Sequence, residues 1–554
     1  MPISVNSHAR STRGRGAKPR RNCDNSMPGV DPVQPRRRGR TTVDGYRFVT
    51  RPTSATFLSH AVYNKVRTNF LNLSMFFAQT RKPQLEIGRK PGLCPAKYRV
   101  HDQARSTHTY VIGVTGKGKS KLLEHLLFQD VTYGNGCGVL DPHSDLADDL
   151  LRYLLSHPQR AARHWSRIIY FDPSRSDYLI PFNVLKSGFP AYETAQNIVE
   201  AFRRTWPKAL DEAPRFANIA TAGILTLIAN GLTLVELPRL LTDRLYRETL
   251  IEPLEDPELV AFWTERYEKW GRETPLMVES ILNKVTAFTL NPQLRLLLGA
   301  EDNGLDFRRI MDEGRVLIVN LGRCDAETRR LIGSLIVTGL EQAARARRDQ
   351  RERRRPFYFC IDEFQDFCAN DGAAQTLAQI LSECRKFGLH LTLSHQTLSQ
   401  VNERMKGALG NIQLKIVFGV SRQDAEILAR HLFQINGDQV KHRVRDTDQQ
   451  TRSHPVYYSL PEVWERCVQT LQNLPGRHAF VQSRQQQQAV RIRTTTIRHA
   501  AIDEDALDAH KLRLLKRVAM RTDALARQIS TRVSTYAYDQ VNEPPQFKET
   551  LAPA

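Results

Sequence analysis

From Thr109 onward, two kinds of segment alternate along the chain. Short runs of consecutive apolar residues predict strands buried on both faces, and the stretches between them repeat apolar residues at helical spacing, as Leu122, Leu123, Leu126 and Leu127 do. Buried strands that alternate with helices are typical of a parallel sheet covered on both faces. The sequence therefore predicts an α/β fold, with strands over residues 110–112, 138–140, 167–171, 315–319, 357–361, 389–393 and 415–420.

Residues 190–310 interrupt this alternation with long amphipathic helical patterns and few strand signals, which predicts an all-helical insertion. The uncharged segment 216–235 approaches the length of a membrane-spanning helix. Asn and Thr residues interrupt it, however, and Asn230-Gly231 favours a turn. We therefore expect a buried helix over 217–229 and no membrane span.

These patterns divide the chain into six parts. In order, we expect a disordered basic arm (1–45), a segment without a clear pattern (46–105), the first part of the α/β domain (106–189), the helical insertion (190–310), the second part of the α/β domain (311–500) and a helical C-terminal tail (501–554), with one charged helix over 503–533.

Composition adds a constraint on the partner. Of the 554 residues, 41% are hydrophobic and 25% charged, which is ordinary for a globular protein and excludes a wholly disordered chain. The net charge is +21, of which residues 1–40 supply +8 and the rest +13. A surplus of this size favours a polyanionic partner, either nucleic acid or an anionic membrane face. The arm itself fits a solvated tail and a nucleic-acid-binding arm equally well.

The eight cysteines form no C-x-x-C pair and no zinc-binding spacing, which favours reduced, buried thiols in the cytoplasm. The basic N-terminus is not followed by an apolar segment, so no secretory signal is expected.

The strongest chemical signal is the run from Gly113 to Ser120, which fits G-x-x-x-x-G-K-[ST] between a predicted strand and a predicted helix. In such a loop the backbone N–H groups face nucleotide phosphates, the lysine reaches the β- and γ-phosphates, and the hydroxyl binds Mg²⁺. The alternative is a chance match in a turn rich in Gly and Lys. We expect the nucleotide to be bound by Gly113, Thr115, Gly116, Lys117, Gly118, Lys119, Ser120 and Lys121.

A second signal is the strand over 357–361, which ends in Asp362 and Glu363. Asp362 is expected to bind Mg²⁺ with Ser120, and Glu363 to polarise the attacking water. Alone, such a pair would be interpreted as a cap on the end of a strand. Downstream of a phosphate loop, it is the expected second half of a hydrolytic site.

Three further polar residues are weaker candidates. Gln396 ends the strand after the acid pair and is expected to sense the γ-phosphate. Arg385, on the preceding helix, could reach a neighbouring subunit's nucleotide as an arginine finger, and Arg422 is a second candidate for that role. For both arginines the alternative is a solvated residue near a helix end.

Two other patterns bear on the function. Asn283-Lys284-Val285-Thr286 lacks the Asp that pairs with guanine, which argues against a GTPase switch. The arginine-rich run 345–355 fits a solvated connector, and in a ring it would equally fit the lining of a polyanion channel.

Taken together, these residues resemble the HerA/FtsK branch of RecA-like motor ATPases, and within it the coupling proteins of type IV secretion and conjugation (the TraG/TraD-like group). The resemblance covers roughly residues 105–500. It rests on ordered segments: 108–113 entering the phosphate loop, Val139-Leu140-Asp141-Pro142-His143, Pro181-Phe182-Asn183-Val184-Leu185, Ile361-Asp362-Glu363-Phe364-Gln365, Arg385-Lys386-Phe387-Gly388-Leu389, Gln396, Leu409-Gly410-Asn411 and 424–429.

The resemblance implies a RecA-like P-loop NTPase domain that assembles into a homo-hexameric ring, with the helical insertion capping the channel and helping to choose cargo. It assigns ATP and Mg²⁺ as cofactors, Asp362 and Glu363 as the hydrolytic acids, Gln396 as the sensor and Arg385 as the trans-acting arginine. Coupling proteins usually begin with transmembrane helices, and this sequence shows none. We therefore expect a cytoplasmic protein that docks at the inner membrane through a separate subunit, or that serves a soluble translocation role.

The function expected from the sequence is an ATP-hydrolysing motor that moves DNA during conjugative transfer, with a relaxase or membrane secretion-channel subunits as further partners. Two alternatives remain open at this point. One is a secretion or assembly ATPase that drives protein export without DNA, and the other is a DNA-binding recruitment module that is not a motor.

Overall fold

The computed structural model describes residues 84–542, apart from 207–215, 351–353, 368–370, 436–438, 446–452, 484–485 and 487. Its contacts divide the chain into residues 1–80 and residues 81–554. The predicted basic arm and most of the segment 46–105 lie outside the described residues.

The larger unit is built on one eleven-stranded sheet with the order β2-β1-β14-β13-β10-β3-β9-β8-β4-β7-β5. From β10 to β5 all neighbouring strands are parallel, as predicted. Their bounds are Thr109–Ile112 (β3), Gly136–Asp141 (β4), Ile168–Phe171 (β5), Val316–Asn320 (β7), Phe357–Ile361 (β8), Leu389–His395 (β9) and Leu414–Val417 (β10). Nearly every residue of these strands is buried, which explains their continuous apolar sequences.

An antiparallel extension that the sequence did not predict widens the sheet beyond β10. It consists of β1 (Leu85–Arg89), β2 (Lys97–Val100), β13 (His478–Gln482) and β14 (Val490–Thr494). In β2 and β14, buried residues alternate with exposed charged ones, because one face of these strands is solvated.

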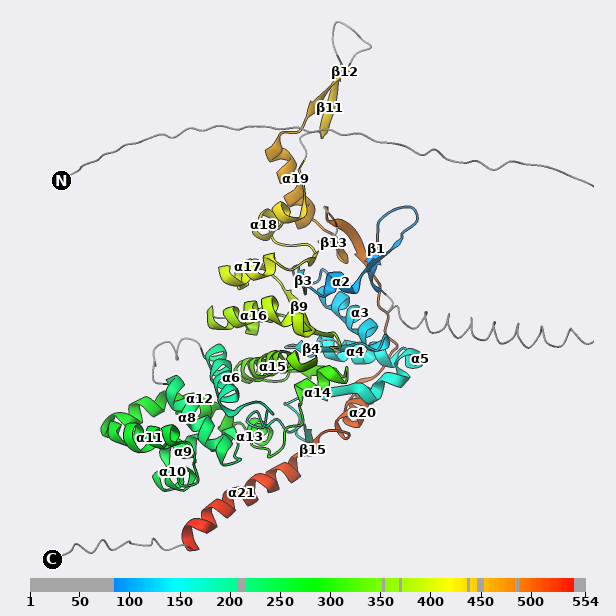
Figure 1. The fold of residues 1–554 in the computed structure, drawn as a ribbon. Coiled ribbons are helices and arrows are strands. Elements are labelled where there is room, and N and C mark those ends of the chain that lie inside the picture. The colour runs from blue at the N-terminus through cyan, green and yellow to red at the C-terminus, as the bar shows by residue number, and fades with distance from the viewer. Residues whose placement is uncertain are drawn as a thin grey trace, which may run out of the picture. The chain divides into compact units, whose positions relative to one another are not determined.

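Helices cover both faces of the sheet (Figure 1). One layer contains α15 (Ala326–Ala346), α16 (Asp371–Glu383), α17 (Glu403–Gly410) and α18 (Arg422–Leu432), and the other contains α2 (Asp102–Arg105), α3 (Lys119–Thr132), α4 (Asp145–Leu155) and α5 (Pro158–Ala161). The α/β fold predicted from the alternation of strands and helices is therefore confirmed.

Between β6 (Tyr178–Leu179) and β7 most of the described residues are helical. The helices are α6 (Ala191–Thr205), α8 (Phe216–Ala229), α9 (Leu237–Thr242), α10 (Arg244–Ile251), α11 (Pro257–Ala261), α12 (Thr274–Leu290), α13 (Pro292–Leu298) and α14 (Phe307–Asp312). Helix α8 is the uncharged segment, and it is buried among the others: Trp263 is fully buried and its indole N–H donates to Oγ1 of Thr226 at 2.9 Å. Within the described residues, no helix combines the length and apolarity needed to cross a bilayer.

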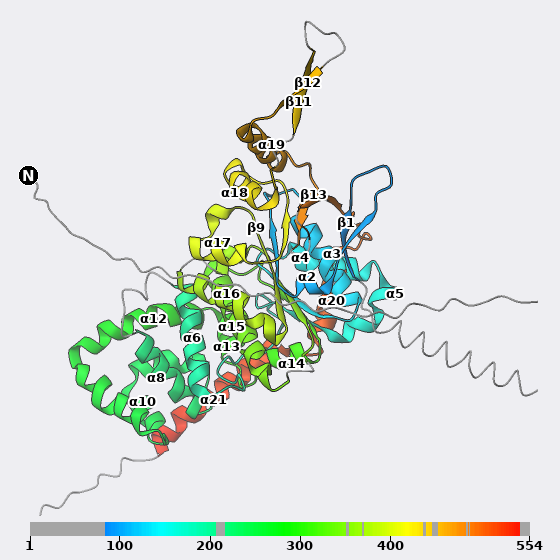
Figure 2. The ribbon, with the colours of Figure 1, turned by 45° about the horizontal axis from the view of Figure 1, so that its top comes forward.

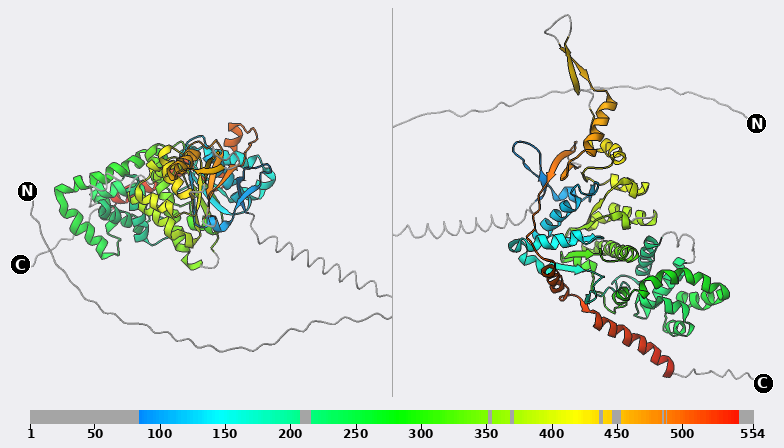
Figure 3. Two further views of the ribbon diagram at one scale, coloured as in Figure 1. Left: turned by 90° about the horizontal axis from the view of Figure 1, so that it is seen from above. Right: turned by 180° about the vertical axis from the view of Figure 1, so that it is seen from behind.

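The C-terminal segment joins the sheet to these helices (Figures 2 and 3). Helix α20 (Glu504–Leu515) packs on β5 and α4, and the buried Lys511 ammonium lies 2.7 Å from Oδ1 of Asp148. Strand β15 (Met520–Arg521) then pairs with β6, and α21 (Thr522–Asn542) packs against α13. Arg532 of α21 also lies 2.6 Å from Glu236, the residue before α9. The single helix predicted over 503–533 is thus wrong, because pairing with β6 interrupts the helical path.

A two-stranded hairpin, β11 (Val440–Arg445) and β12 (Ser453–Tyr457), forms a small sheet of its own. It precedes α19 (Leu460–Gln472), which packs against α18.

Candidate nucleotide-hydrolysis site

The predicted site residues, apart from Arg385, lie where the parallel strands end. Because β3, β4, β8 and β9 run parallel, their carboxyl ends share one edge of the sheet, and the segments that leave them lie side by side. The phosphate loop leaves β3, the acid pair leaves β8 and Gln396 leaves β9.

The phosphate loop has the backbone that its glycines permit. Gly116 and Gly118 have φ of +78° and +103°, in the left-handed region that favours glycine. Gly113 allows a close approach, since a Cβ there would lie 2.5 Å from Cβ of Phe418. The N–H of Val114 donates to the carbonyl of Gly419 at 2.9 Å, which ties the loop to the residues after β10.

Lys119 lies at the base of this loop beside the acids. Its ammonium donates to the carbonyl of Gly113 at 2.7 Å and is buried. Burial lowers the pKa of Lys119, and the carboxylates of Glu363 and Asp362 oppose that shift. The hydroxyl-bearing residue Ser120 follows at the first turn of α3 and is exposed.

The acid pair is buried, with Asp362 and Glu363 each 6% exposed. Burial raises the pKa of Asp362 from 3.8 to about 6, and the charges of Glu363 and Asp141 add to the shift, while Lys119 opposes it. Glu363 has a φ of 44°, which few residues other than glycine adopt. Strained backbone of this kind is concentrated at functional sites, where the surrounding structure enforces it.

A chain of hydrogen bonds connects the loop to the acid. The Thr115 hydroxyl donates to Oε1 of Gln396 at 2.9 Å, and Nε2 of Gln396 donates to Oε1 of Glu363 at 2.9 Å. Nε2 of Gln365 donates to the other oxygen of Glu363 at 2.8 Å. The structure thus brings Gln396, the weakest candidate at this edge, into contact with both the phosphate loop and the hydrolytic acid.

Two other lysines, Lys117 in the motif and Lys121 directly after it, direct their ammonium groups elsewhere. That of Lys117 donates to the carbonyl of Leu474 at 2.8 Å. That of Lys121 pairs with Glu124 at 3.0 Å and with Asp149 at 2.5 Å.

Arg385 lies at the opposite edge of the sheet, in the turn before β9. A strand of seven residues spans roughly 20 Å, so this guanidinium is far from the phosphate loop of its own chain. Arg385 is exposed, and among the described residues it forms no ion pair. Arg422 lies at the same edge as the phosphate loop, but its guanidinium donates to both oxygens of Glu465, at 2.9 and 2.8 Å.

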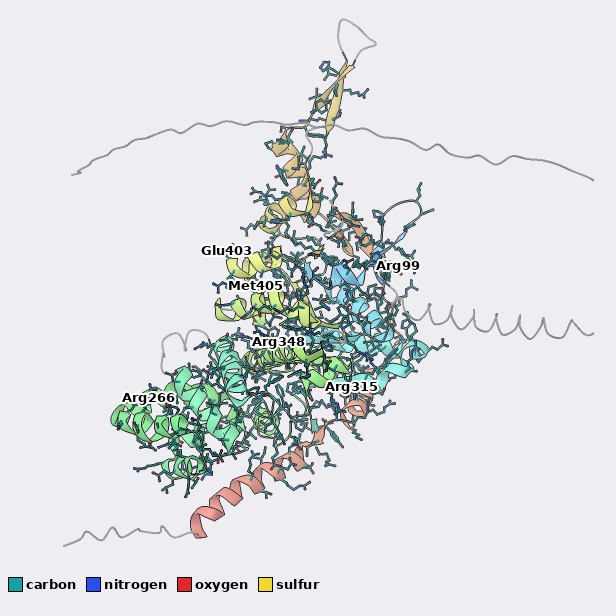
Figure 4. All side chains as sticks on the ribbon, in the orientation of Figure 1. Arg99, Arg266, Arg315, Arg348, Glu403 and Met405 are labelled. Atoms are coloured by element: carbon teal, nitrogen blue, oxygen red, sulfur yellow. The ribbon has the colours of Figure 1, made fainter. Side chains whose placement is uncertain are left out.

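In the arginine-rich run 345–355, of which the structure describes residues 345–350 and 354–355, Arg347 is neither solvated nor part of a channel lining. Arg347 is fully buried, pairs with Asp312 at 2.8 Å and donates to the carbonyls of Phe387 and Arg355. Arg354 also donates to backbone carbonyls, and Arg348 lies near the end of α15 (Figure 4). These side chains fix the segments that enter β8 and β9.

Three residues at the site were not among the predicted ones. Gln365 contacts Glu363, and its signal was its place in the acid-bearing segment. Asp141 ends β4, accepts hydrogen bonds from the N–H groups of His143 and Ala147, and adds negative charge near Asp362. Arg477 donates its backbone N–H to the carbonyl of Lys117 at 2.8 Å. No local sequence pattern predicts this contact of Arg477, because Lys117 and Arg477 lie far apart in the sequence.

A phosphate loop between β3 and α3, an acid pair at the end of β8 and a glutamine at the end of β9 together define a RecA-like P-loop nucleotide-binding domain. Residues 94–495 match the family described as the type IV secretion-system coupling protein DNA-binding domain. Since this match spans more than half of the sequence, the chain belongs to that family. No curated protein matches the chain.

Solved structures with the same fold include TrwB, a bacterial conjugative coupling protein. The unbound form TrwBdeltaN70 superposes with a TM-score of 0.52 at 17% identity, covering 76% of this chain and 92% of that one. TrwB in complex with ADP and Mg²⁺ gives 0.53 at 18% identity, covering 77% and 92%. TrwB with the GTP analogue GDPNP also gives 0.53 at 18% identity, covering 77% and 93%. These similarities establish the shared fold.

Proposed function

We propose that this protein is an Mg-ATP-hydrolysing motor that moves DNA as the coupling protein of a conjugative type IV secretion system. The observation that carries the proposal is the hydrogen-bonded path from Thr115 through Gln396 to Glu363. It links the loop that would hold the phosphates to the acid that would activate water, which simple nucleotide storage does not require. Family membership supports the DNA partner.

In this proposal the phosphate loop binds ATP through its backbone N–H groups and Lys119. The ammonium of Lys119 now bonds a carbonyl of its own loop, and it would exchange that acceptor for phosphate oxygens. Ser120 and Asp362 are suited to hold Mg²⁺, because an exposed hydroxyl after β3 and a buried carboxylate after β8, at the same edge of the sheet, offer the oxygen ligands that this ion takes together with phosphates. The ion would neutralise charge that develops on the phosphates.

Hydrolysis then requires a base and a group that orients the water. Glu363 accepts a proton from water as the water oxygen bonds to the γ-phosphorus and the bond to the ADP oxygen breaks. Gln396 orients the water and contacts the γ-phosphate, a role that fits its place between Thr115 and Glu363. The products are ADP and inorganic phosphate.

The position of Arg385 gives a reason for assembly. This guanidinium lies at the edge of the sheet opposite its own phosphate loop, so a catalytic role requires the nucleotide of another subunit. A homo-hexameric ring would place it there, and hydrolysis would then change the contacts between subunits. Arg422 remains the second candidate for this role.

The remaining parts of the proposal concern cargo and location. The helical insertion would cap the channel and contribute to cargo choice, and basic groups along the channel would follow the DNA backbone. A relaxase and membrane secretion-channel subunits are the expected protein partners. We propose a cytoplasmic location, with docking at the inner membrane through such a partner.

The test is steady-state hydrolysis of ATP and GTP, with and without DNA, at low and moderate salt, with Lys119→Ala as the blank. The proposal predicts hydrolysis that DNA stimulates and that salt weakens, since DNA contacts release counterions. A rate indifferent to DNA would favour a protein-export ATPase. Nucleotide and DNA binding by an assembled ring without turnover would favour a recruitment module.

A further inference from the structure

The carboxylate of Glu363 is held from two sides by glutamines that come from different parts of the fold. Gln396 donates to Oε1 and stands at the end of β9, where Thr115 links it to the phosphate loop. Gln365 donates to Oε2 and belongs to the same turn as Glu363. A displacement of the phosphate loop therefore acts on the first amide, whereas the second moves with the acid itself.

The turn that carries Gln365 is firmly anchored. Phe364 is fully buried, and its ring centroid lies 4.9 Å from that of His395 at the end of β9. Phe367 packs against Gly333 of α15 so closely that a Cβ there would lie 2.1 Å from its ring. Gln365 lies between these anchors, so its amide reaches Glu363 from a fixed backbone.

The carbonyl oxygen of the Gln365 amide lacks a hydrogen bond. Its Oε1 is buried and has no hydrogen-bond partner in the part of the chain that the structure describes. Buried amide oxygens are paired in the great majority of cases, and exceptions are concentrated at functional sites. The contact with Glu363 is thus the hydrogen bond that sets the orientation of this amide.

We propose that Gln365 is a positioning residue for hydrolysis, which holds Oε2 of Glu363 while Gln396 exchanges its contact with Oε1 for one with the bound nucleotide. Oε1 is then free to accept the proton of the attacking water, and Gln365 keeps the carboxylate from rotating. This inference rests on the proposed function, since it deepens the role of Glu363.

Two substitutions separate the donor from the shape of the side chain. Gln365→Met keeps the length and removes the N–H donor, and Gln365→Glu keeps the shape and places a second carboxylate beside Glu363. We expect kcat to fall roughly tenfold for Met and further for Glu, because like charges repel. KM for ATP and the affinity for a fluorescent ATP analogue should stay within about twofold, since the residue acts on Glu363.

Gln469→Met is the matched control: it removes the same kind of bond, to Glu465 on the exposed face of α19, and should leave kcat unchanged.

The decisive measurement is a double-mutant comparison on the full chain. A residue that acts through Glu363 should change nothing further in a Glu363→Gln background, so the residual rate of the double variant should equal that of Glu363→Gln alone. A further tenfold loss in that background, or wild-type kcat in Gln365→Met, would overturn the inference while wild-type turnover upholds the proposed function. No turnover by the unaltered chain above the Lys119→Ala blank would overturn both.

Discussion

Asp362 should cost the protein stability when no nucleotide is bound, and Asp362→Asn should recover it. The side chain is 6% exposed, and burial with the nearby charges of Glu363 and Asp141 raises its pKa from 3.8 to about 6. A pKa raised by folding means that the ionised form is disfavoured in the native state. Protonated Asp362 therefore favours the folded state. This contribution to the free energy of unfolding is fully present below the ordinary pKa of 3.8 and is lost as the pH rises through 6.

The shift of about two pKa units corresponds to about 3 kcal/mol above pH 7. Asn mimics the neutral acid, so Asp362→Asn should be more stable than the unaltered protein by up to that amount at pH 7.5. The difference should shrink toward zero as the pH falls from 6 to 4. For a chain of 554 residues, 1 kcal/mol corresponds to roughly 1 °C, so the midpoint should rise by about 3 °C.

The assay is thermal unfolding between pH 4 and 8 in the presence of a chelator and without nucleotide. The surface variant Asp505→Asn is the control and should differ from the unaltered protein by less than about 0.5 kcal/mol at every pH. Added Mg-ADP should raise the midpoint of the unaltered protein more than that of Asp362→Asn, since a cation favours the ionised acid. A variant less stable than the unaltered protein at pH 7.5, or a gain independent of pH, would refute the argument from burial.

Three further outcomes follow from the contacts. Gln396→Leu should lower kcat by roughly a hundredfold and change nucleotide affinity by less than about threefold, because it removes a group that acts on the reacting centre; equal losses in both would contradict this. Arg385→Ala should abolish hydrolysis without weakening nucleotide binding, and mixing it with Lys119→Ala should restore part of the rate through mixed interfaces; no recovery in mixed rings would count against action in trans. Lys511→Met should lower stability by about 3 kcal/mol at neutral pH, seen as a lower thermal midpoint, because it leaves the carboxylate of Asp148 unpaired; an unchanged midpoint would show that this pair does not fasten α20.

The sequence predicts the strands that are buried on both faces along their whole length. The parallel strands are apolar throughout because helices cover both faces, so their positions follow from single runs such as 357–361. Strands β2 and β14 are not predicted from the sequence. They are only four or five residues long, and exposed Lys and Arg residues interrupt their apolar pattern. The break between α20 and α21 depends on pairing with β6, more than 300 residues earlier, and no local pattern reports it.

The site shows the same division. Lys119, Ser120, Asp362 and Glu363 were predictable, because a motif fixes their backbone and the ends of parallel strands bring them together. The ammonium group of Lys117 binds a carbonyl after α19, and that of Lys121 binds a carboxylate on α4. Because these partners lie outside the motif, the motif alone does not predict where the two ammonium groups point.

The most direct test of the account is whether the assembled protein moves along DNA. Displacement of streptavidin from a biotinylated DNA end can be measured with ATP, with a non-hydrolysable analogue and with Lys119→Ala, on single- and double-stranded substrates. The account predicts displacement that requires both hydrolysable ATP and an intact Lys119. ATP hydrolysis by a ring that binds DNA but never displaces the block would contradict it.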